Sequence, residues 1–345
     1  MKTFKKHRDY GFWDQDIRLS KLSQLGDPLE RLNKGVDFEM FREFLEDRLT
    51  KEPEGKGGRP PYDYVMMFKI MILQRYYNLS DHQAEFQIND RMSFMRFLNF
   101  SIADDIPDSS TIWNFREQLT DLDLIEELFD MFLKELDKLG LIVNEGKIVD
   151  ASFVEVPRQR NSREENKQIK EGGIPERFEA NPHVKCQKDT DARWTQKNKV
   201  NYFGYKNHAK QDAGSKIIVK YIVTDASVHD SQVTEELLDE KDTGEDFYAD
   251  SAYSGAPQEK IIAAKEMNNR VCEKGARNRP LTDEQKASNR EKSRVRSRVE
   301  HIFGFMEMSM NGMYINSIGI KRATAIIGLM NLTYNMYRKI QLIPV

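Results

Sequence analysis

The 345-residue chain lacks the features of a membrane protein or of a protein held together by disulfides. Its most apolar run, 64–73, includes Lys69 and is shorter than the ~20 residues that a helix needs to cross a bilayer. The basic N-terminus has no apolar stretch of the kind found in a signal peptide. Two cysteines, Cys186 and Cys272, are too few for a disulfide framework, and neither has the neighbours that a zinc site needs. We therefore expect a cytoplasmic protein without membrane contact.

The chain also lacks a strong overall charge: its formal net charge is −3, which does not by itself indicate a nucleic-acid-binding protein. It has no glycine-rich motif for nucleotide phosphates and no motif for a nucleophilic side chain. The basic residues are nevertheless concentrated, since 270–298 holds ten Lys or Arg against four Asp or Glu. That stretch could neutralise phosphates, although a solvated helix face would have the same composition.

The first part of the sequence has the periodicity of helices. Apolar residues recur at helical spacing over 37–50, 62–77 and 121–139. Ser80 followed by Gln83 forms a capping box that opens another helix. Three short helices between 80 and 118 could form a helix-turn-helix-like unit whose last helix presents Asn114 and Arg116 to DNA. Simple packing among helices explains the same pattern.

Near residue 141 the pattern changes to that of strands. Alternating segments rich in β-branched residues predict strands at 141–156, 200–212, 216–227, 246–253 and 270–275. The polar, basic segment 157–200 predicts a long loop or insertion, and a basic helix is expected over 282–308. The expected fold class is α+β, in which a helical region, 1–140, precedes a mixed sheet flanked by helices in 141–345.

Three carboxylates stand at positions where this fold could bring them together. Asp150 lies within the first predicted strand, Asp250 at the end of the fourth, and Glu300 on the last long helix. Each alone is more typical of a turn or cap residue. Together, three acids on one side of a sheet could hold divalent metals, and Mg²⁺ suits such a site because it prefers carboxylate oxygens and retains replaceable waters.

Several segments occur in an order that is similar to a known family. They are GRPPYDYVMMFKIMILQRYYNLSD, KIVDASFVEV, YFGYKNHAKQD, IVTDASVHDSQ, FYADSAYSG and RVRSRVEHIFGFM. The first resembles the N-terminal helical region, and the others resemble the successive motifs, of the DDE transposases of bacterial insertion sequences, of the IS-five type within the IS-four group. The resemblance covers nearly the whole chain. It implies a ribonuclease H-like catalytic domain, metal binding by Asp150, Asp250 and Glu300, and recognition of terminal inverted repeats.

The family signature around the glutamate has a tyrosine, an arginine and a lysine at fixed spacing from it. Arg296 matches the arginine, but Ser293 stands at the tyrosine position and Glu307 at the lysine position. A carboxylate at 307 would repel DNA phosphates where a lysine would attract them. Lys321 and Arg322 are candidates for a substitute cation.

Other residues in the matching motifs have candidate roles around this site. Arg294, Arg296 and Arg298 are candidates for DNA binding. Hydrogen-bonded support of the metal ligands, or satisfied polar packing, is expected of His208, Asp212, Asp225 and His301. His301 follows Glu300 on the helix and points about 100° away from it, so it could also contact DNA.

These features predict an enzyme that cuts and rejoins DNA with Mg²⁺, for which Mn²⁺ could substitute. Its expected partners are the double-stranded DNA of the element ends and of the target, and we expect a homodimer on DNA, associated with the nucleoid. Two alternatives remain at the level of sequence. Glu307 favours a DNA-binding protein that has lost catalysis, and a metal-dependent nuclease without strand transfer would carry the same carboxylates.

Overall fold

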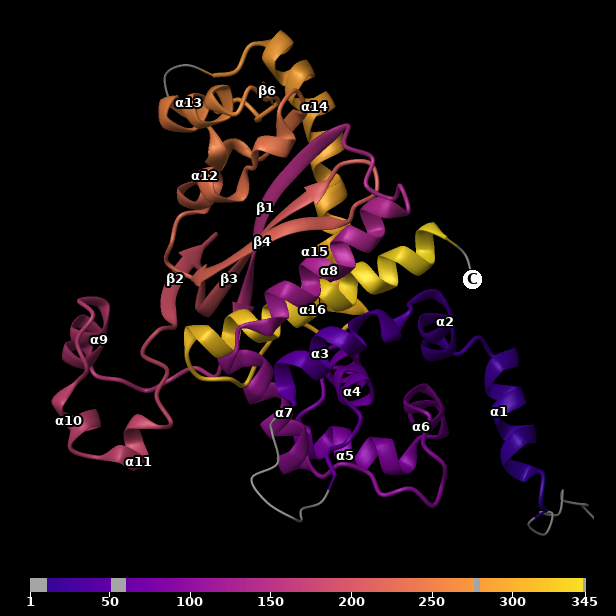
Figure 1. Ribbon diagram of the computed structural model, residues 1–345. Coiled ribbons are helices and arrows are strands. Elements are labelled where there is room, and N and C mark those ends of the chain that lie inside the picture. The colour runs from indigo at the N-terminus through magenta and orange to yellow at the C-terminus, as the bar shows by residue number, and fades with distance from the viewer. Residues whose placement is uncertain (1–10, 51–59, 276–279, 344–345) are drawn as a thin grey trace, which may run out of the picture.

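The computed structural model describes residues 11–50, 60–275 and 280–343. A helical region forms the lower part of the molecule in Figure 1, and the sheet lies above it. None of the described helices is both long and apolar enough to cross a membrane.

Eight α-helices and a short 3₁₀ helix make up the described part of the N-terminal region. They are α1 (Asp14–Gln24), α2 (Pro28–Gly35), η1 (Phe38–Phe41), α3 (Arg42–Leu49), α4 (Tyr64–Tyr77), α5 (Asp81–Asp90), α6 (Met92–Leu98), α7 (Ser109–Asp121) and α8 (Leu124–Lys138). The predicted capping box of Ser80 and Gln83 is present at the start of α5. Asp108 caps α7 by accepting a hydrogen bond from the backbone N–H of Thr111.

The C-terminal region is built on a six-stranded sheet. Its strands are β1 (Gly146–Glu155), β2 (Arg193–Lys197), β3 (Val200–Asp212), β4 (Ile218–Asp225), β5 (Asp246–Tyr248) and β6 (Asn268–Asn269). β3 lies antiparallel between β1 and β4, whereas β5 and β6 continue the sheet in parallel from β1. The order β4-β3-β1-β5-β6 makes a mixed sheet, as predicted, and β2 pairs with the first part of β3. No strand forms at 270–275, where one was expected; the short strand β6 lies just before it, at Asn268–Asn269.

The insertion between β1 and β3 is more structured than a loop. It holds α9 (Arg163–Lys170), α10 (Glu176–Glu179), α11 (Pro182–Lys185) and then β2. Ile169 and Phe178 are buried, so this segment has apolar side chains that the Gly- and Pro-rich sequence obscured. β2 and β3 form a hairpin whose two loop residues, Asn198 and Lys199, have positive φ, as a tight hairpin turn requires.

The remaining helices follow β4. They are η2 (Asp230–Val233), α12 (Thr234–Leu237), η3 (Glu240–Asp242), η4 (Ser251–Tyr253), α13 (Ala256–Ala264), α14 (Asp283–Arg296), η5 (Ser297–Val299), α15 (Glu300–Met308) and α16 (Ile320–Leu342). The single helix expected over 282–308 is therefore divided, because the 3₁₀ turn η5 separates α14 from α15. This division places Glu300 at the first residue of a helix.

α16 joins the two regions. It lies beside α8 across the middle of the molecule (Figure 1) and also packs on α2, α4, α7 and β4. Tyr337 of α16 stacks on Tyr76 of α4 with ring centroids 4.0 Å apart. On its sheet side, Asn335 bonds both the N–H and the carbonyl of Ile218 at 2.9 and 2.8 Å. Among the described residues, the helical region and the sheet thus contribute side chains to one hydrophobic core.

Candidate active site

Asp150 lies on β1 at the point where the pairing between β1 and β5 ends. β5 pairs with β1 over Gly146–Ile148 and then ends, so the carboxylate sits just beyond the paired segment. It accepts hydrogen bonds from the N–H of Ala151 at 2.8 Å and from Arg296 Nη1 at 3.0 Å. Burial raises the pKa of Asp150 to about 6, and the charge of Asp250 adds to the rise, while the bonds from Ala151 and Arg296 oppose it. Asp150 is therefore a half-buried acid, with 15% of its side chain exposed, whose negative charge is incompletely compensated.

Arg296 connects Asp150 to Glu300. Its second guanidinium nitrogen, Nη2, lies 3.5 Å from Glu300 Oε1, and the two residues are four apart across η5. Val299, in the middle of this turn, is fully buried against Ile148 and fixes the turn on the sheet. One guanidinium thus stands between two carboxylates from different elements.

Asp250 follows β5 and caps η4, where its carboxylate accepts a hydrogen bond from the N–H of Ala252 at 2.8 Å. The capping role typical of such an aspartate is therefore real, yet its charge also reaches Asp150. Tyr253, at the end of η4, is buried among acids. Burial, followed by the charges of Asp230, Asp150 and Asp250, raises its pKa well above the ordinary value.

The three carboxylates suit a divalent cation in their chemistry, because all their ligand atoms are oxygens. They also suit one in charge, because a positively charged guanidinium already lies between two of them. Among the described residues, however, no group of three or more acidic, His or Cys side chains stands ready to hold a metal ion. The expected convergence within reach of two metals is not met as these side chains stand. Arg296 separates Asp150 from Glu300, whose side chain is 64% exposed.

The polar residues expected around the site serve the fold instead. Asp212 is fully buried and accepts bonds from the N–H groups of Asn144 and Ser215. His208 is also fully buried, and its Nε2 lies 2.9 Å from Thr224 Oγ1. Burial lowers the pKa of His208 to about 4, so the ring is neutral at pH 7. Satisfied polar packing, the simpler of the two expectations, describes Asp212, whereas the buried Nδ1 of His208 has no hydrogen-bond partner among the described residues.

Asp225 and His301 also have structural partners. Asp225 accepts a hydrogen bond from the N–H of Ser227 at 2.8 Å in the turn after β4. His301 packs edge-on against Tyr334 of α16, with ring centroids 6.4 Å apart. Neither side chain bonds to the three carboxylates in the described part of the chain. Asp225 therefore closes a turn, and His301 packs on α16.

Arg116 does not face outward as a DNA-reading residue would. Its guanidinium makes two bonds to the carboxylate of Asp81, at 2.6 and 2.8 Å, and so ties α7 to α5. Only 12% of its side chain is exposed. The helix-turn-helix interpretation is therefore wrong for Arg116, because a bidentate ion pair already uses its donors. Asn114 of the same helix is exposed.

The three arginines near the glutamate differ in their surroundings. Arg294 is exposed, and its guanidinium has no partner among the described residues. Arg298 is exposed as well but donates to the carbonyl of Ala213 at 2.7 Å. Arg296 is held by carboxylates. The basic stretch 270–298 also contains 276–279, which lie outside the described residues.

The departures from the family signature have different consequences. Ser293 Oγ lies 3.5 Å from Cys272 Sγ. Glu307 is exposed on α15 and has no ion pair within the described ranges. The expected substitute cations are directed elsewhere, since Lys321 lies 3.6 Å from Asp123 and Arg322 lies 2.6 Å from Glu117. Both bind the N-terminal helices, which excludes them as cations at the carboxylates.

The sequence interpretation missed the hairpin of β2 and β3. After Arg296 and Asp250, Lys197 is the next group whose charge reaches Asp150. Trp194 on the same hairpin is 43% exposed and packs beneath the guanidinium of Arg158, 5.9 Å from its ring. One signal was available: 193–211 contains five Lys or Arg and no acid. The hairpin therefore brings one cation, Lys197, within electrostatic reach of Asp150, while Trp194 points to the opposite face of β2.

Two family models match this chain, and one solved structure is similar to it. A family model described as a transposase domain matches residues 17–118, and one described as a transposase DDE domain matches residues 143–336. Among solved structures, the chain is similar to the piggyBac transposase in its synaptic complex with hairpin DNA. That match has a TM-score of 0.45 and 12% sequence identity, and covers 93% of this chain and 76% of the other.

Proposed function

We propose that this chain, which belongs to the DDE transposases, cuts a phosphodiester at the ends of its element and then joins the freed 3′ hydroxyl to target DNA. DDE transposases are DNA transposases that use divalent metal ions. Asp150, Asp250 and Glu300 are the catalytic carboxylates of this proposal. The observation that carries it is the sharing of one guanidinium by Asp150 and Glu300 at the opening of the sheet, beside Asp250.

The chain's own residues prepare the site for a cation. Asp150 carries a negative charge that is only partly compensated, because its partner Arg296 is shared with Glu300. When bound, Mg²⁺, or Mn²⁺ in its place, would activate the attacking oxygen and stabilise the leaving one. Once released from the carboxylates, Arg296 has the planar donors to hold a DNA phosphate by two hydrogen bonds. The protein thus contributes placement and charge neutralisation, as phosphoryl transfer requires.

Double-stranded DNA is the proposed partner, and side chains of α14 and of the hairpin fit it. Arg294 projects from α14, and Lys197 and Trp194 lie on the hairpin. Cationic side chains neutralise phosphates, and an exposed aromatic ring can stack on a base that has left the duplex. In this arrangement Lys197 supplies the positive charge that Glu307 does not.

The reaction needs two element ends held together, so we propose that the enzyme acts as a homodimer on DNA, in the nucleoid of the cytoplasm. Each chain would hold one end in its own carboxylate site. The terminal inverted repeats would be recognised mainly by the N-terminal helices, on which Asn114 remains an exposed candidate.

A second candidate function is DNA binding without catalysis. Exposed and unpaired among the described residues, Glu307 favours it, because a carboxylate near the DNA path weakens phosphate binding. A nuclease that does not rejoin strands is a third. The test incubates the full chain with duplexes carrying its element's terminal repeats and a target plasmid in Mg²⁺. Nicked and joined products support transposition, nicked products alone indicate a nuclease, and binding without either product indicates the non-catalytic protein.

A further inference from the structure

Helix α1 directs apolar side chains away from the rest of the molecule. It lies at the right-hand edge of the molecule in Figure 1, and none of its residues is buried. Trp13, at its N-cap, is 64% exposed, and Ile17 is 48% exposed. Single exposed apolar residues are common on proteins, but two in one stripe of a short helix form a surface that water solvates poorly.

The opposite face of α1 is anchored. Leu19 and Leu22 are half-buried there. From α6, Arg96 donates to the carbonyl of Leu19 at 3.2 Å and to Ser23 Oγ at 2.8 Å. It also forms an ion pair with Asp27 at 2.6 Å. The outward direction of the Trp13 and Ile17 side chains is therefore set by contacts on the other side of the helix.

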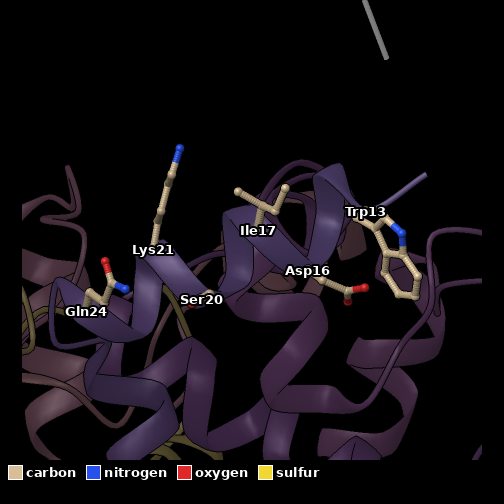
Figure 2. Close-up of a pocket in the computed structure, with 6 residues that line it drawn as sticks. All are labelled: Trp13, Asp16, Ile17, Ser20, Lys21 and Gln24. Carbon is tan, nitrogen blue, oxygen red and sulfur yellow. The ribbon is translucent and has the colours of Figure 1, made fainter. Parts of the chain in front are cut away.

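The exposed face has the spacing of a coiled-coil seam. Trp13, Ile17, Ser20 and Gln24 follow one another at intervals of four, three and four residues, which is the a/d repeat of a heptad. Asp16 and Lys21 flank this seam at the g and e positions. A shallow, open pocket lies along this exposed face of α1. Figure 2 shows the side chains that line it: Trp13, Asp16, Ile17, Ser20, Lys21 and Gln24.

The charges on the two flanks are complementary to a second copy of the same helix. In a parallel pair, a g residue meets the e residue five positions later on the partner helix, so Asp16 faces the second copy's Lys21, and the reverse pair forms by symmetry. Neither residue has an ion pair within the described parts of the chain. An antiparallel pair would instead place Lys21 near Asp14, whose carboxylate already accepts the N–H of Gly11 at 2.8 Å. The parallel orientation therefore pairs the two side chains that have no partner among the described residues, and cross-linking tests it against the antiparallel one.

We propose that α1 is a self-association surface, which pairs in parallel with α1 of a second copy of this chain. Trp13 and Ile17 form the apolar seam, and two Asp16–Lys21 pairs fix its register. The inference rests on the homodimer of the proposed function and gives that homodimer a contact. It involves no step of DNA chemistry.

The seam is short, so we expect the two copies of α1 to bind each other only weakly. α1 has 11 residues, so a pair of such helices is smaller than the interfaces of about 1,200 Å² that hold stable complexes. Two chains bound to paired element ends would be at high effective concentration, where a weak contact closes. Free protein should therefore dimerise through α1 only weakly, and a covalent trap is the suitable probe.

The first experiment traps the seam in the full chain with Cys186 changed to Ser. Under a mild oxidant, Gln24→Cys should form a disulfide-linked dimer, because the two copies of position 24 meet in a parallel pair. Arg18→Cys, exposed on another face of α1, is the matched control and should link far less. Equal linking of the two variants would overturn the proposal. Links between Trp13→Cys and Gln24→Cys chains, without links between two Gln24→Cys chains, would overturn the parallel orientation.

The second experiment exchanges charges in the Gln24→Cys protein. Asp16→Lys and Lys21→Asp each place like charges across the seam and should each reduce linking about tenfold. Mixing the two variants restores both opposite-charge pairs and should restore linking between them. Since the mixture contains the same two proteins, its recovery shows that both are folded, and failure to recover contradicts the pairing. Nicking of single element ends is measured in parallel: if the parent nicks but does not link, the α1 inference alone fails, whereas a parent without nicking contradicts the proposed function.

Discussion

Two arginine–aspartate pairs in this protein have the same chemistry and opposite properties. In the N-terminal region Arg116 binds both oxygens of Asp81, at 2.6 and 2.8 Å. In the sheet region Arg296 makes one bond to Asp150, at 3.0 Å, and is shared with Glu300. Burial acts to raise the pKa of both acids. Bonds from Arg116 and Gln74 outweigh it and lower the pKa of Asp81, whereas the pKa of Asp150 is raised to about 6.

The difference separates a pair that holds the fold from one that serves a reaction. A bidentate bond uses the full donor geometry of the guanidinium and leaves little charge on the acid uncompensated. A guanidinium shared by two carboxylates compensates only part of their negative charge. A divalent cation would therefore bind favourably there. Strongly perturbed acids at an opening in a sheet are typical of functional sites.

The largest contrast is expected in catalysis. Asp150→Asn, Asp250→Asn and Glu300→Gln should each reduce cleavage of element ends to background, since amides keep the shape but lose the charge that holds a divalent cation. Binding to the same DNA without metal should remain. Asp81→Asn is the matched control and should keep cleavage at a temperature where it is folded. Cleavage by the Asp150→Asn protein would remove this residue from the site.

Stability should change in opposite directions for the two pairs. Asp81→Asn leaves Arg116 without its partner and should lower the free energy of unfolding by about 2 kcal/mol, below the range for fully buried pairs because 21% of the Asp81 side chain is exposed. Asp150→Asn removes a half-buried, poorly compensated charge and should raise the free energy of unfolding of the metal-free protein by about 1–3 kcal/mol at pH 8. Urea unfolding in chelator measures both. Destabilisation by both substitutions would erase the contrast.

The pH dependence of stability gives the sign of each shift. Asp150 has a pKa near 6 in the folded protein, above its ordinary 3.8, so its ionisation weakens the fold above pH 6 and this penalty disappears as the pH falls toward 4. The gain from Asp150→Asn should therefore shrink between pH 7 and pH 4. The lowered pKa of Asp81 has the opposite sign, and its stabilisation is lost as the pH falls below 4. Melting curves recorded from pH 8 to well below pH 4 should show the Asp150 effect above pH 4 and the Asp81 effect below it.

DNA binding should distinguish free arginines from paired ones. Arg294→Ala should flatten the log-log dependence of affinity on salt by about 0.9, the value for one phosphate contact on duplex DNA. Arg116→Ala, compared at a temperature where it is folded, should leave that slope unchanged. Fluorescence anisotropy across a salt series measures both slopes. Equal slopes for Arg294→Ala and the parent would remove Arg294 from the interface.

The smallest effect is expected at Glu307. It lies seven residues after Glu300, nearly two helical turns along the same face of α15. Glu307→Lys exchanges repulsion of DNA for attraction, but solvent and salt screen an exposed charge, so affinity should rise about two- to fivefold at low salt. Glu236→Lys, on another helix, is a control for the change in net charge. Equal gains from both substitutions would mean that position 307 has no special relation to the DNA.

Periodicity and capping signals predicted most of the fold, and motif order indicated the carboxylates. The helices around 64–77 and 81–90 were predictable because local residues specify them, including the Ser80 and Gln83 box. The insertion was not, since its few buried apolar side chains lie within a polar sequence. Non-local pairing was also invisible: no local pattern shows that Arg116 meets Asp81, or that Arg322 meets Glu117 rather than the active site.

Because α16 packs between the first helices and the sheet, those earlier elements cannot complete their core until α16 has been synthesised. Residues 320–342 leave the ribosome after both of them, yet Tyr337 stacks on Tyr76 and Asn335 completes the bonding of Ile218. Contacts between such distant residues form late and slow the folding of the whole chain. A copy of the gene interrupted before the codons of α16 should consequently produce a fragment whose apolar core is exposed. Cells should degrade such a fragment, so it would not compete with the intact protein for DNA.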